Sequence, residues 1–213
     1  MYVKEPDGQL PDFESKYSDE PITDISVDVE TVKQLLLHLN CDKSMGPDSC
    51  HPRVLKEAAE QLAYPLSLLK SCTLPTIWKE ANASALFKNK GDKTEPSNYR
   101  PVSLTCITCK LTEKIVRSVI VNHLTTNQLF SSCQFGFRNK RSCVLQLVDV
   151  FDDLTWNYDT GHQTDIVYLG IKKAFDTVRH RRLLLKLKSY GFEGILLSWI
   201  ENFLMNRRQS VFF

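Results

Sequence analysis

The sequence lacks any long apolar run. A membrane-spanning helix needs about 18–20 consecutive apolar residues, and no stretch of this chain approaches that length. The first residues also lack a basic start followed by an apolar stretch, so no secretory signal is visible. These absences predict an intracellular protein, nuclear or cytoplasmic, with no membrane partner. No internal repeat is evident either.

A complete zinc pattern is also missing. Cys106 and Cys109 have the spacing of half a zinc site, but no second CxxC or HxxxH follows them. They lie in an apolar stretch that leads into a predicted helix, so we interpret them as structural. The chain has seven cysteines. An odd number without an export signal predicts reduced thiols.

The net charge is only +2 over 213 residues, but the charges are unevenly spread. Residues 1–30 carry nine acids against two lysines, whereas residues 88–141 carry ten Lys and Arg against three acids. Residues 172–188 carry seven Lys and Arg against one acid. The apolar residues that interrupt these basic regions suit a folded surface facing a polyanion. Solvated helix faces are the alternative interpretation of the same charges.

Hydrophobic residues make up 42% of the chain, enough for a real core. Apolar spacing, with Asp28 and Ser142 as caps, predicts helices over 28–39, 52–62, 104–124, 142–158, 181–190 and 193–204. Strands are predicted over 83–87, 166–169 and from 207 onward. Helices mixed with few, separated strands favour the α+β class.

The stretch 164–180 is where we expect the chemistry of this chain. Residues 166–169 form an apolar, β-branched and aromatic run that predicts a buried strand. Functional side chains are commonly placed where such a strand ends, because the strand fixes their position. The residue at that end is Gly170.

Four segments, in this order, carry a resemblance to a known family: KSMGPDSCHPRVLKE, WKEANASALFKNKGDKTEPSNYRPVSLT, QFGFRNKRSC and DIVYLGIKKAFDTVRHRRLLLKLKSYG. Together they resemble the reverse transcriptase of non-LTR (LINE-type) retrotransposons, from about residue 30 to the end. The resemblance implies a right-hand polymerase fold of fingers, palm and thumb. It divides the chain into an acidic flexible tail (1–27), a fingers-like region (28–160) and a truncated first part of the palm (161–213), with the thumb absent.

The reaction implied by the resemblance is nucleotidyl transfer onto a primer 3′-hydroxyl, which copies RNA into DNA. Its partners are an RNA template and DNA primer, or an RNA–DNA hybrid, and a deoxynucleotide. Two Mg²⁺ ions held by carboxylates bridge the reacting groups. The family takes one carboxylate from the Asp that ends the first palm strand and the others from a paired Asp in a later hairpin.

Residue by residue, the resemblance assigns Lys88 or Lys90, together with Arg100, to the incoming triphosphate, because these cations pair with phosphate oxygens. Phe175 matches the aromatic residue beneath the nucleotide sugar. The template-contacting loop is matched by Gly136, Phe137, Arg138 and Arg141, where glycine permits close approach and arginines meet phosphates. The alternatives are solvated loops for the cations and a plain core phenylalanine for Phe175.

The decisive departure from the family is Gly170, which stands where the metal-binding Asp is expected. Glycine offers no side-chain oxygen, so no catalytic residue is intact and productive Mg²⁺ binding is not expected. Lys172 also brings a positive charge near the expected metal pocket. The only acidic doublet after an aromatic residue, Asp152 and Asp153, precedes the predicted strand and is interpreted as a solvated helix face.

Two further departures concern length. Between Leu69 and Leu74 the chain is shorter than the family pattern, which indicates a trimmed fingers helix. An incomplete palm leaves its sheet without partners and exposes an edge. We therefore expect an inactive fragment of an RNA-directed DNA polymerase. The alternatives are a non-catalytic RNA- or DNA-binding module that uses the basic fingers loops, and a small interaction protein.

Overall fold

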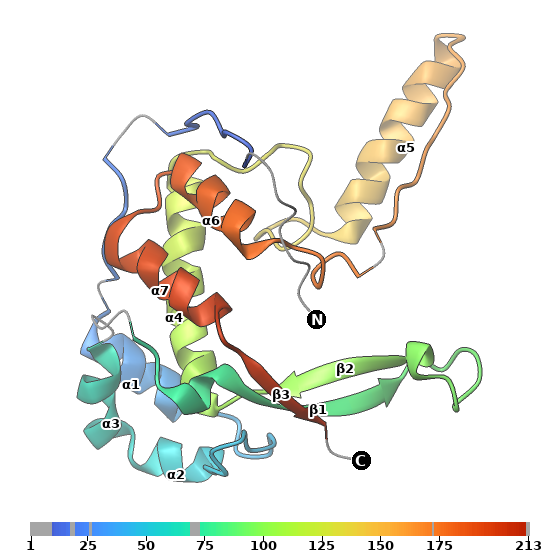
Figure 1. Cartoon of the computed structure of the whole chain (residues 1–213). Helices are drawn as coiled ribbons and strands as arrows, with labels where there is room; N and C mark the ends of the chain where they lie inside the picture. Colours follow the sequence, from blue (N-terminus) through green and yellow to red (C-terminus); the bar gives the residue numbers. More distant parts are fainter. Residues whose placement is uncertain (1–9, 18–19, 26, 69–72, 172, 212–213) are drawn as a thin grey trace.

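The structure is a computed structural model that describes residues 10–17, 20–25, 27–68, 73–171 and 173–211. Figure 1 shows helices packed around one long helix, with a small sheet at one end. The helices are α1 (Val29–Leu37), α2 (Pro52–Glu57), α3 (Ala59–Ser67), α4 (Ile107–Thr126), α5 (Cys143–Asp159), α6 (His180–Ser189) and α7 (Gly194–Leu204), with short 3-10 helices η1 (Thr76–Lys79) and η2 (Pro96–Asn98). The strands are β1 (Glu80–Phe87), β2 (Tyr99–Leu104) and β3 (Arg208–Val211). The predicted mixture of helices and strands is confirmed.

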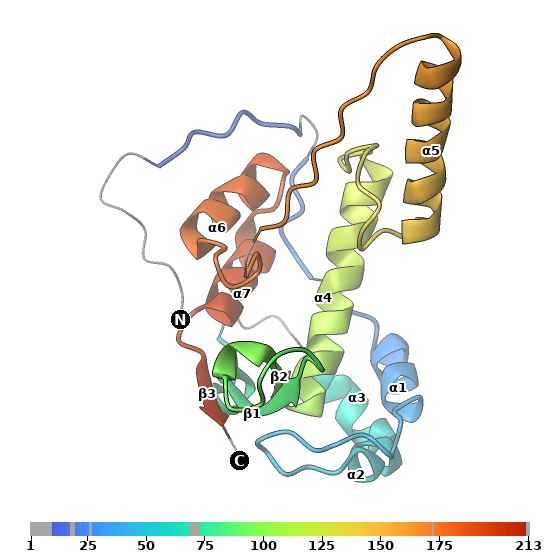
Figure 2. The same cartoon turned by 90° about the vertical axis from the view of Figure 1, so that its right-hand side faces the viewer.

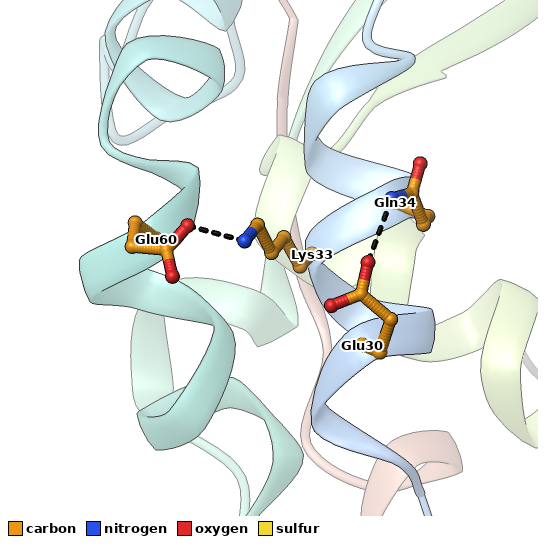
Figure 3. Close-up of polar contacts among 4 residues, drawn as sticks. All are labelled: Glu30, Lys33, Gln34 and Glu60. Carbon is orange, nitrogen blue, oxygen red and sulfur yellow. Dashed lines mark hydrogen bonds and ion pairs between the residues drawn. The ribbon is translucent and has the colours of Figure 1, made fainter.

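α1 packs on α3 at one end of the helical body. Asp28 caps α1 as predicted, because its carboxylate accepts a hydrogen bond from the backbone N–H of Thr31 at 3.1 Å. The buried side of α1 joins a core that also contains residues of α4 and α7. On the outer side, Lys33 forms an ion pair with Glu60 of α3 (Figure 3). Glu30 accepts a hydrogen bond from the Gln34 amide on the same helix, 2.7 Å away (Figure 3).

The helix predicted over 52–62 is two helices. Ala58 has φ −90° and ψ 17°, outside the α-helical region, and it separates α2 from α3. The apolar spacing of the sequence continues through this break, so periodicity alone does not reveal it. Residues 69–72, which include part of the segment predicted to be trimmed, lie outside the described residues.

The three-stranded sheet has the order β2-β1-β3. β1 and β2 are antiparallel, with Leu86 opposite Arg100, and β3 pairs with β1 in parallel. The sequence prediction missed β2, because its residues were assigned to a polar loop and to the start of the next helix. Pro101 fits this strand because β2 is an edge, where a missing N–H is tolerated.

Part of the predicted flexible tail is packed against the body. The backbone N–H of Lys16 donates to the carbonyl of Ser189, and that of Ile22 donates to Gly191, each at 2.8 Å. Ile25 is buried in the core with α1, α4 and α7. The prediction of a flexible tail over 1–27 is therefore wrong for these residues, because their apolar side chains find partners between the acids. Residues 1–9, 18–19 and 26 lie outside the described part.

The strand predicted over 166–169 is absent, and this prediction was wrong. The segment has no assigned secondary structure, and Leu169 is 90% exposed. A strand needs a partner for its backbone groups, and within the described residues nothing pairs with this segment. Figures 1 and 2 show that it returns from the far end of α5, which itself projects from the body. No residue of α5 is buried.

Candidate nucleic-acid interface

The β1–β2 hairpin carries the first group of predicted site residues. Directly opposed residues of an antiparallel pair point to the same face of the sheet, and side chains alternate along each strand. Arg100 lies opposite Leu86, and the backbone N–H of Lys88 bonds to the carbonyl of Asn98 at 2.8 Å, which continues the ladder. Lys88 and Arg100 therefore lie on one face of the hairpin. They are diagonal neighbours, for which the Cα atoms are typically about 7–8 Å apart.

Hydrogen bonds at the tip of the hairpin stabilise its conformation. The Lys88 Nζ donates to the backbone carbonyl of Ser97 at 2.6 Å, and the Tyr99 hydroxyl donates to the carbonyl of Lys93 at 2.9 Å. A hydrogen bond from the backbone N–H of Thr94 lowers the pKa of Asp92, so this loop keeps one negative charge among its lysines. Lys90, at the tip, is exposed.

The other face of the sheet forms a pocket of about 540 Å³ that the sequence did not predict. Its lining includes Ala83 and Ala85 of β1, Tyr99 and Pro101 of β2, and Val211 of β3. The register explains the set, because these positions of neighbouring strands share a face. Small alanines on the central strand leave the space that larger residues would fill.

The second predicted group lies in the loop before α5. Arg138 donates from Nη1 to the carbonyl of Ser131 at 2.7 Å, so its guanidinium folds back onto its own loop. Arg141 lies over the ring of the buried Phe135, with 4.7 Å between the guanidinium carbon and the ring centroid. Gly136 has open space around the position of a Cβ, so intramolecular packing does not require glycine there.

Phe137 of this loop meets Phe175. Their ring centroids are 6.1 Å apart at an interplanar angle of 88°, an edge-to-face contact. Both rings are about 80% exposed, so the alternative of a plain core phenylalanine for Phe175 is wrong. The β1–β2 hairpin and α5 extend from the helical body at different places (Figure 1).

The residues around Gly170 do not fit a magnesium ion. Mg²⁺ prefers oxygen ligands in octahedral geometry, and the glycine supplies no side-chain oxygen. Nothing lies within 4 Å of the position that its Cβ would take. Over the residues that the structure describes, no group of three His, Cys, Asp or Glu side chains could hold a metal ion. Lys172, predicted to lie near the metal pocket, is outside the described residues.

Two other sequence interpretations agree with the geometry. Cys106 and Cys109 are buried, and Cys109 Sγ lies 3.2 Å from a carboxylate oxygen of Glu113. Burial raises the pKa of Cys106 to about 11, and burial also raises the pKa of Cys109, so both thiols stay protonated and inert. Asp152 and Asp153 are exposed on α5, as expected for a solvated helix face.

Comparison with known protein families identifies the family of this chain. The family model described as reverse transcriptase (RNA-dependent DNA polymerase) matches residues 88–213, more than half of the chain. The chain belongs to this family. The match includes Lys88, β2, the loop before α5 and the segment around Gly170, whereas β1 precedes it.

Proteins similar to this reverse transcriptase chain include polymerases of mobile elements. The chain is 29% identical over 202 residues to the "Probable RNA-directed DNA polymerase from transposon BS" of Drosophila melanogaster, an alignment covering 89% of this chain and 22% of the relative. It is 27% identical over 187 residues to the "RNA-directed DNA polymerase from mobile element jockey" of the same species, covering 85% and 20%. The predicted resemblance to non-LTR reverse transcriptases is confirmed.

The chain spans about a fifth of the length of the curated relatives it matches. Among the helices in the described part of this reverse transcriptase chain, none is both long and apolar enough to cross a membrane.

Proposed function

We propose that this chain supplies the fingers and the first part of the palm of a right-hand RNA-directed DNA polymerase. In this proposal residues 28–160 form the fingers-like region and residues 161–213 begin the palm. The family match supports the proposal, and one observation carries it furthest. The strand register brings two cations from separate sequence segments, Lys88 and Arg100, onto one face of the hairpin. A phosphate chain is the natural partner of such a face.

The proposed ligand is an RNA template with a DNA primer, or an RNA–DNA hybrid, and a deoxynucleotide. Lys88, Lys90 and Arg100 pair with phosphate oxygens. Arg138 and Arg141 contact the template backbone, and Gly136 permits its close approach. The exposed Phe137 and Phe175 rings offer faces on which a base or sugar rests.

We further propose that the chain binds nucleic acid without polymerising it. In the family, two Mg²⁺ ions supply the charge that stabilises the transferring phosphoryl group. The residues at Gly170 do not fit that ion, so this chain contributes positioning only. Binding without catalysis is therefore the activity that its own residues support.

Binding to an RNA–DNA hybrid at a series of salt concentrations tests the hairpin assignment. Fluorescence anisotropy is expected to show weaker binding for Lys88→Ala and for Arg100→Ala. Each lost phosphate contact should also reduce the slope of log affinity against log salt by roughly 0.7–0.9. Arg117→Ala is the matched control, because Arg117 is an exposed arginine that belongs to α4 and not to the hairpin. Equal affinities and slopes for Arg100→Ala and the control would remove the hairpin from the proposal.

The template loop has its own test, because Arg138 is engaged within its loop. The double variant Arg138→Ala, Arg141→Ala is expected to bind hybrid more weakly and with a smaller salt slope. Circular dichroism of the free protein shows whether α5, which follows the loop, is kept. Unchanged hybrid binding by the double variant would mean that these arginines only shape the loop.

A further inference from the structure

A second cluster of cations surrounds a pocket of about 490 Å³ at the base of the sheet. The pocket lies between η1, the first residue of β1 and the turn that leads from α7 into β3. We call it the basal pocket, and it is lined by Thr76, Lys79, Glu80, Asn206, Arg207 and Arg208. Three of these side chains are cations and one is a carboxylate, so the lining carries a net charge of +2.

Arg207 is held in a fixed orientation at this pocket. Its Nη1 donates to the carbonyl of Phe203 on α7, 3.1 Å away, and its guanidinium lies over the Phe203 ring, 4.5 Å from the centroid. Phe203 in turn stacks on the buried Trp199, with 5.2 Å between ring centroids and an interplanar angle of 9°. A guanidinium has five N–H donors, so Arg207 keeps donors for a ligand. Because the side chain is already ordered, a ligand loses little affinity to ordering it.

The turn before β3 brings the other donors to the pocket. Asn206 has φ 56°, a left-handed conformation that asparagine tolerates better than most residues. β3 then pairs with β1 in parallel, with Arg208 opposite Glu80, so Arg208 lies beside the end of η1 where Lys79 stands. Over the residues that the structure describes, neither Lys79 nor Arg208 forms an ion pair. Converging cations that are not neutralised are complementary to an anion.

We propose that the basal pocket binds a phosphate group, supplied by the backbone of a nucleic acid. An arginine fork pairs with two phosphate oxygens, and lysine adds a point charge. Protein–nucleic-acid interfaces also use neutral donors such as Thr76 and Asn206 for phosphate oxygens. The pocket is larger than a single phosphate ion, which leaves room for the sugar that a backbone phosphate carries.

This assignment rests on the proposed nucleic-acid binding and extends it along the sheet. Side chains alternate along a strand, so Glu80 and Lys88 point to the same face, and Arg208 shares that face as the partner of Glu80. The eight residues of β1 separate the two groups of cations by roughly 26 Å, at about 3.3 Å per residue. One nucleic-acid backbone can therefore contact the hairpin cations and the basal pocket together.

Charge removal at the pocket tests the proposal. Fluorescence anisotropy with an RNA–DNA hybrid is expected to show about fivefold weaker binding for Lys79→Gln and for Arg208→Gln, the effect of one close charge pair in water. Each variant should also reduce the slope of log affinity against log salt by roughly 0.7–0.9. Arg117→Gln, the same change at an exposed arginine of α4, is the matched control and should alter neither quantity.

Glu80→Gln provides a readout in the opposite direction. Its carboxylate is the one negative charge of the lining, so removing it should tighten hybrid binding about twofold or more. Partial unfolding would weaken binding instead, and circular dichroism of each variant checks the fold. Weaker binding by a folded Glu80→Gln, or Lys79→Gln and Arg208→Gln variants that both bind like Arg117→Gln, would overturn the basal pocket. The hairpin assignment would stand in that case if Lys88→Ala still weakens binding.

Inorganic pyrophosphate tests the pocket without a nucleic acid. On titration, the backbone amide NMR signals of residues 206–208 are expected to shift in the unmodified chain and to stay in place in Arg208→Gln. These shifts in a chain that binds no hybrid would support a pocket for a free phosphate compound, while the proposed nucleic-acid binding fails. Neither hybrid binding nor pyrophosphate shifts would overturn both.

Discussion

Two glycines of this chain occupy opposite environments. A Cβ at Gly46 would lie 2.6 Å from the Cα of Cys106 and 2.7 Å from the carbonyl oxygen of Thr105, where α4 begins. At Gly170 the same atom would meet nothing within 4 Å. Packing therefore requires glycine at position 46, whereas the fold would accept a side chain at position 170. Steric crowding therefore does not explain why this chain has glycine instead of aspartate at position 170.

Gly46→Ala is expected to destabilise the protein by about 1–3 kcal/mol, because the backbone atoms at the start of α4 must move to admit the methyl group. Urea unfolding followed by circular dichroism measures the change. Gly136→Ala is the matched control, since a Cβ there meets nothing within 4 Å. If both variants unfold at the same urea concentration, the loop at Gly46 does not pack on α4 as described.

The buried thiols predict a pH dependence at alkaline pH. The pKa of Cys106 rises from its ordinary 9.0 to about 11 in the folded state. The unfolded chain therefore loses this proton first, so the stability that Cys106 contributes is full below pH 9 and declines as the pH rises towards 11, by at most about 1.4 kcal/mol per pH unit for this one thiol. Unfolding free energies at pH 8, 9 and 10 measure the slope. Cys106→Ala should reduce the slope and leave the contribution of Cys109, whose pKa is also raised by burial, whereas Cys133→Ala, at an exposed thiol, should retain the original slope.

At the scale of elements, the N-terminal segment belongs to the helical body. Tyr17 packs against the ring of His123 on α4, with 4.8 Å between ring centroids, and Phe192 packs on the same imidazole at 4.8 Å. His123 Nε2 lies 2.9 Å from the carbonyl of Tyr190, which ties α4 to the junction between α6 and α7. One buried imidazole thus joins three separate stretches of the chain.

Ile25→Ala tests whether this segment is structural. Ile25 is 2% exposed, and removing a buried aliphatic side chain of this size costs about 2–5 kcal/mol. A flexible tail would instead give no change. Thermal and urea unfolding distinguish these outcomes. Val54→Ala, at a position that is 60% exposed on α2, is the control for the loss of a β-branched side chain at the surface.

The elements also indicate which parts of the fold the sequence could predict. α1 and α5 were predicted with their caps, Asp28 and Ser142, because helix spacing and capping are local. The strand over 166–169 was predicted wrongly because a strand exists only with a partner, which local composition does not supply. β2 was missed because its serine and proline resemble a loop.

The candidate site could also be predicted only where it depends on local sequence. The residue types at Lys88 and Arg100 could be assigned from the sequence, but their common face depends on the β1–β2 register. The contact between Phe137 and Phe175 joins positions 38 residues apart and depends on tertiary structure. The pocket on the alanine face requires all three strands, so no single motif could have predicted it.

At the scale of the whole molecule, a helical body carries two extensions, the β1–β2 hairpin and α5 with its returning segment (Figure 1). The cations predicted to bind phosphate lie on the hairpin. Gly170, the position expected for the metal ligand, lies at the end of the segment that returns from α5. Of the acids that follow Gly170, namely Asp176, Glu193 and Glu201, no two are adjacent. The hairpin cations proposed to bind phosphate and the position expected for the metal ligand therefore lie on different extensions.

Gly170→Asp is consequently expected not to create a polymerase. The side chain fits, because the position is open, but one carboxylate cannot replace the set that holds two Mg²⁺ ions in the family. A primer-extension assay with an RNA template, a DNA primer, deoxynucleotides and Mg²⁺ should give no more product than the unmodified chain. Hybrid binding by the same preparation serves as the control, since Lys88 and Arg100 are unchanged. Template-dependent extension by Gly170→Asp alone would show that other carboxylates of this chain complete the metal site.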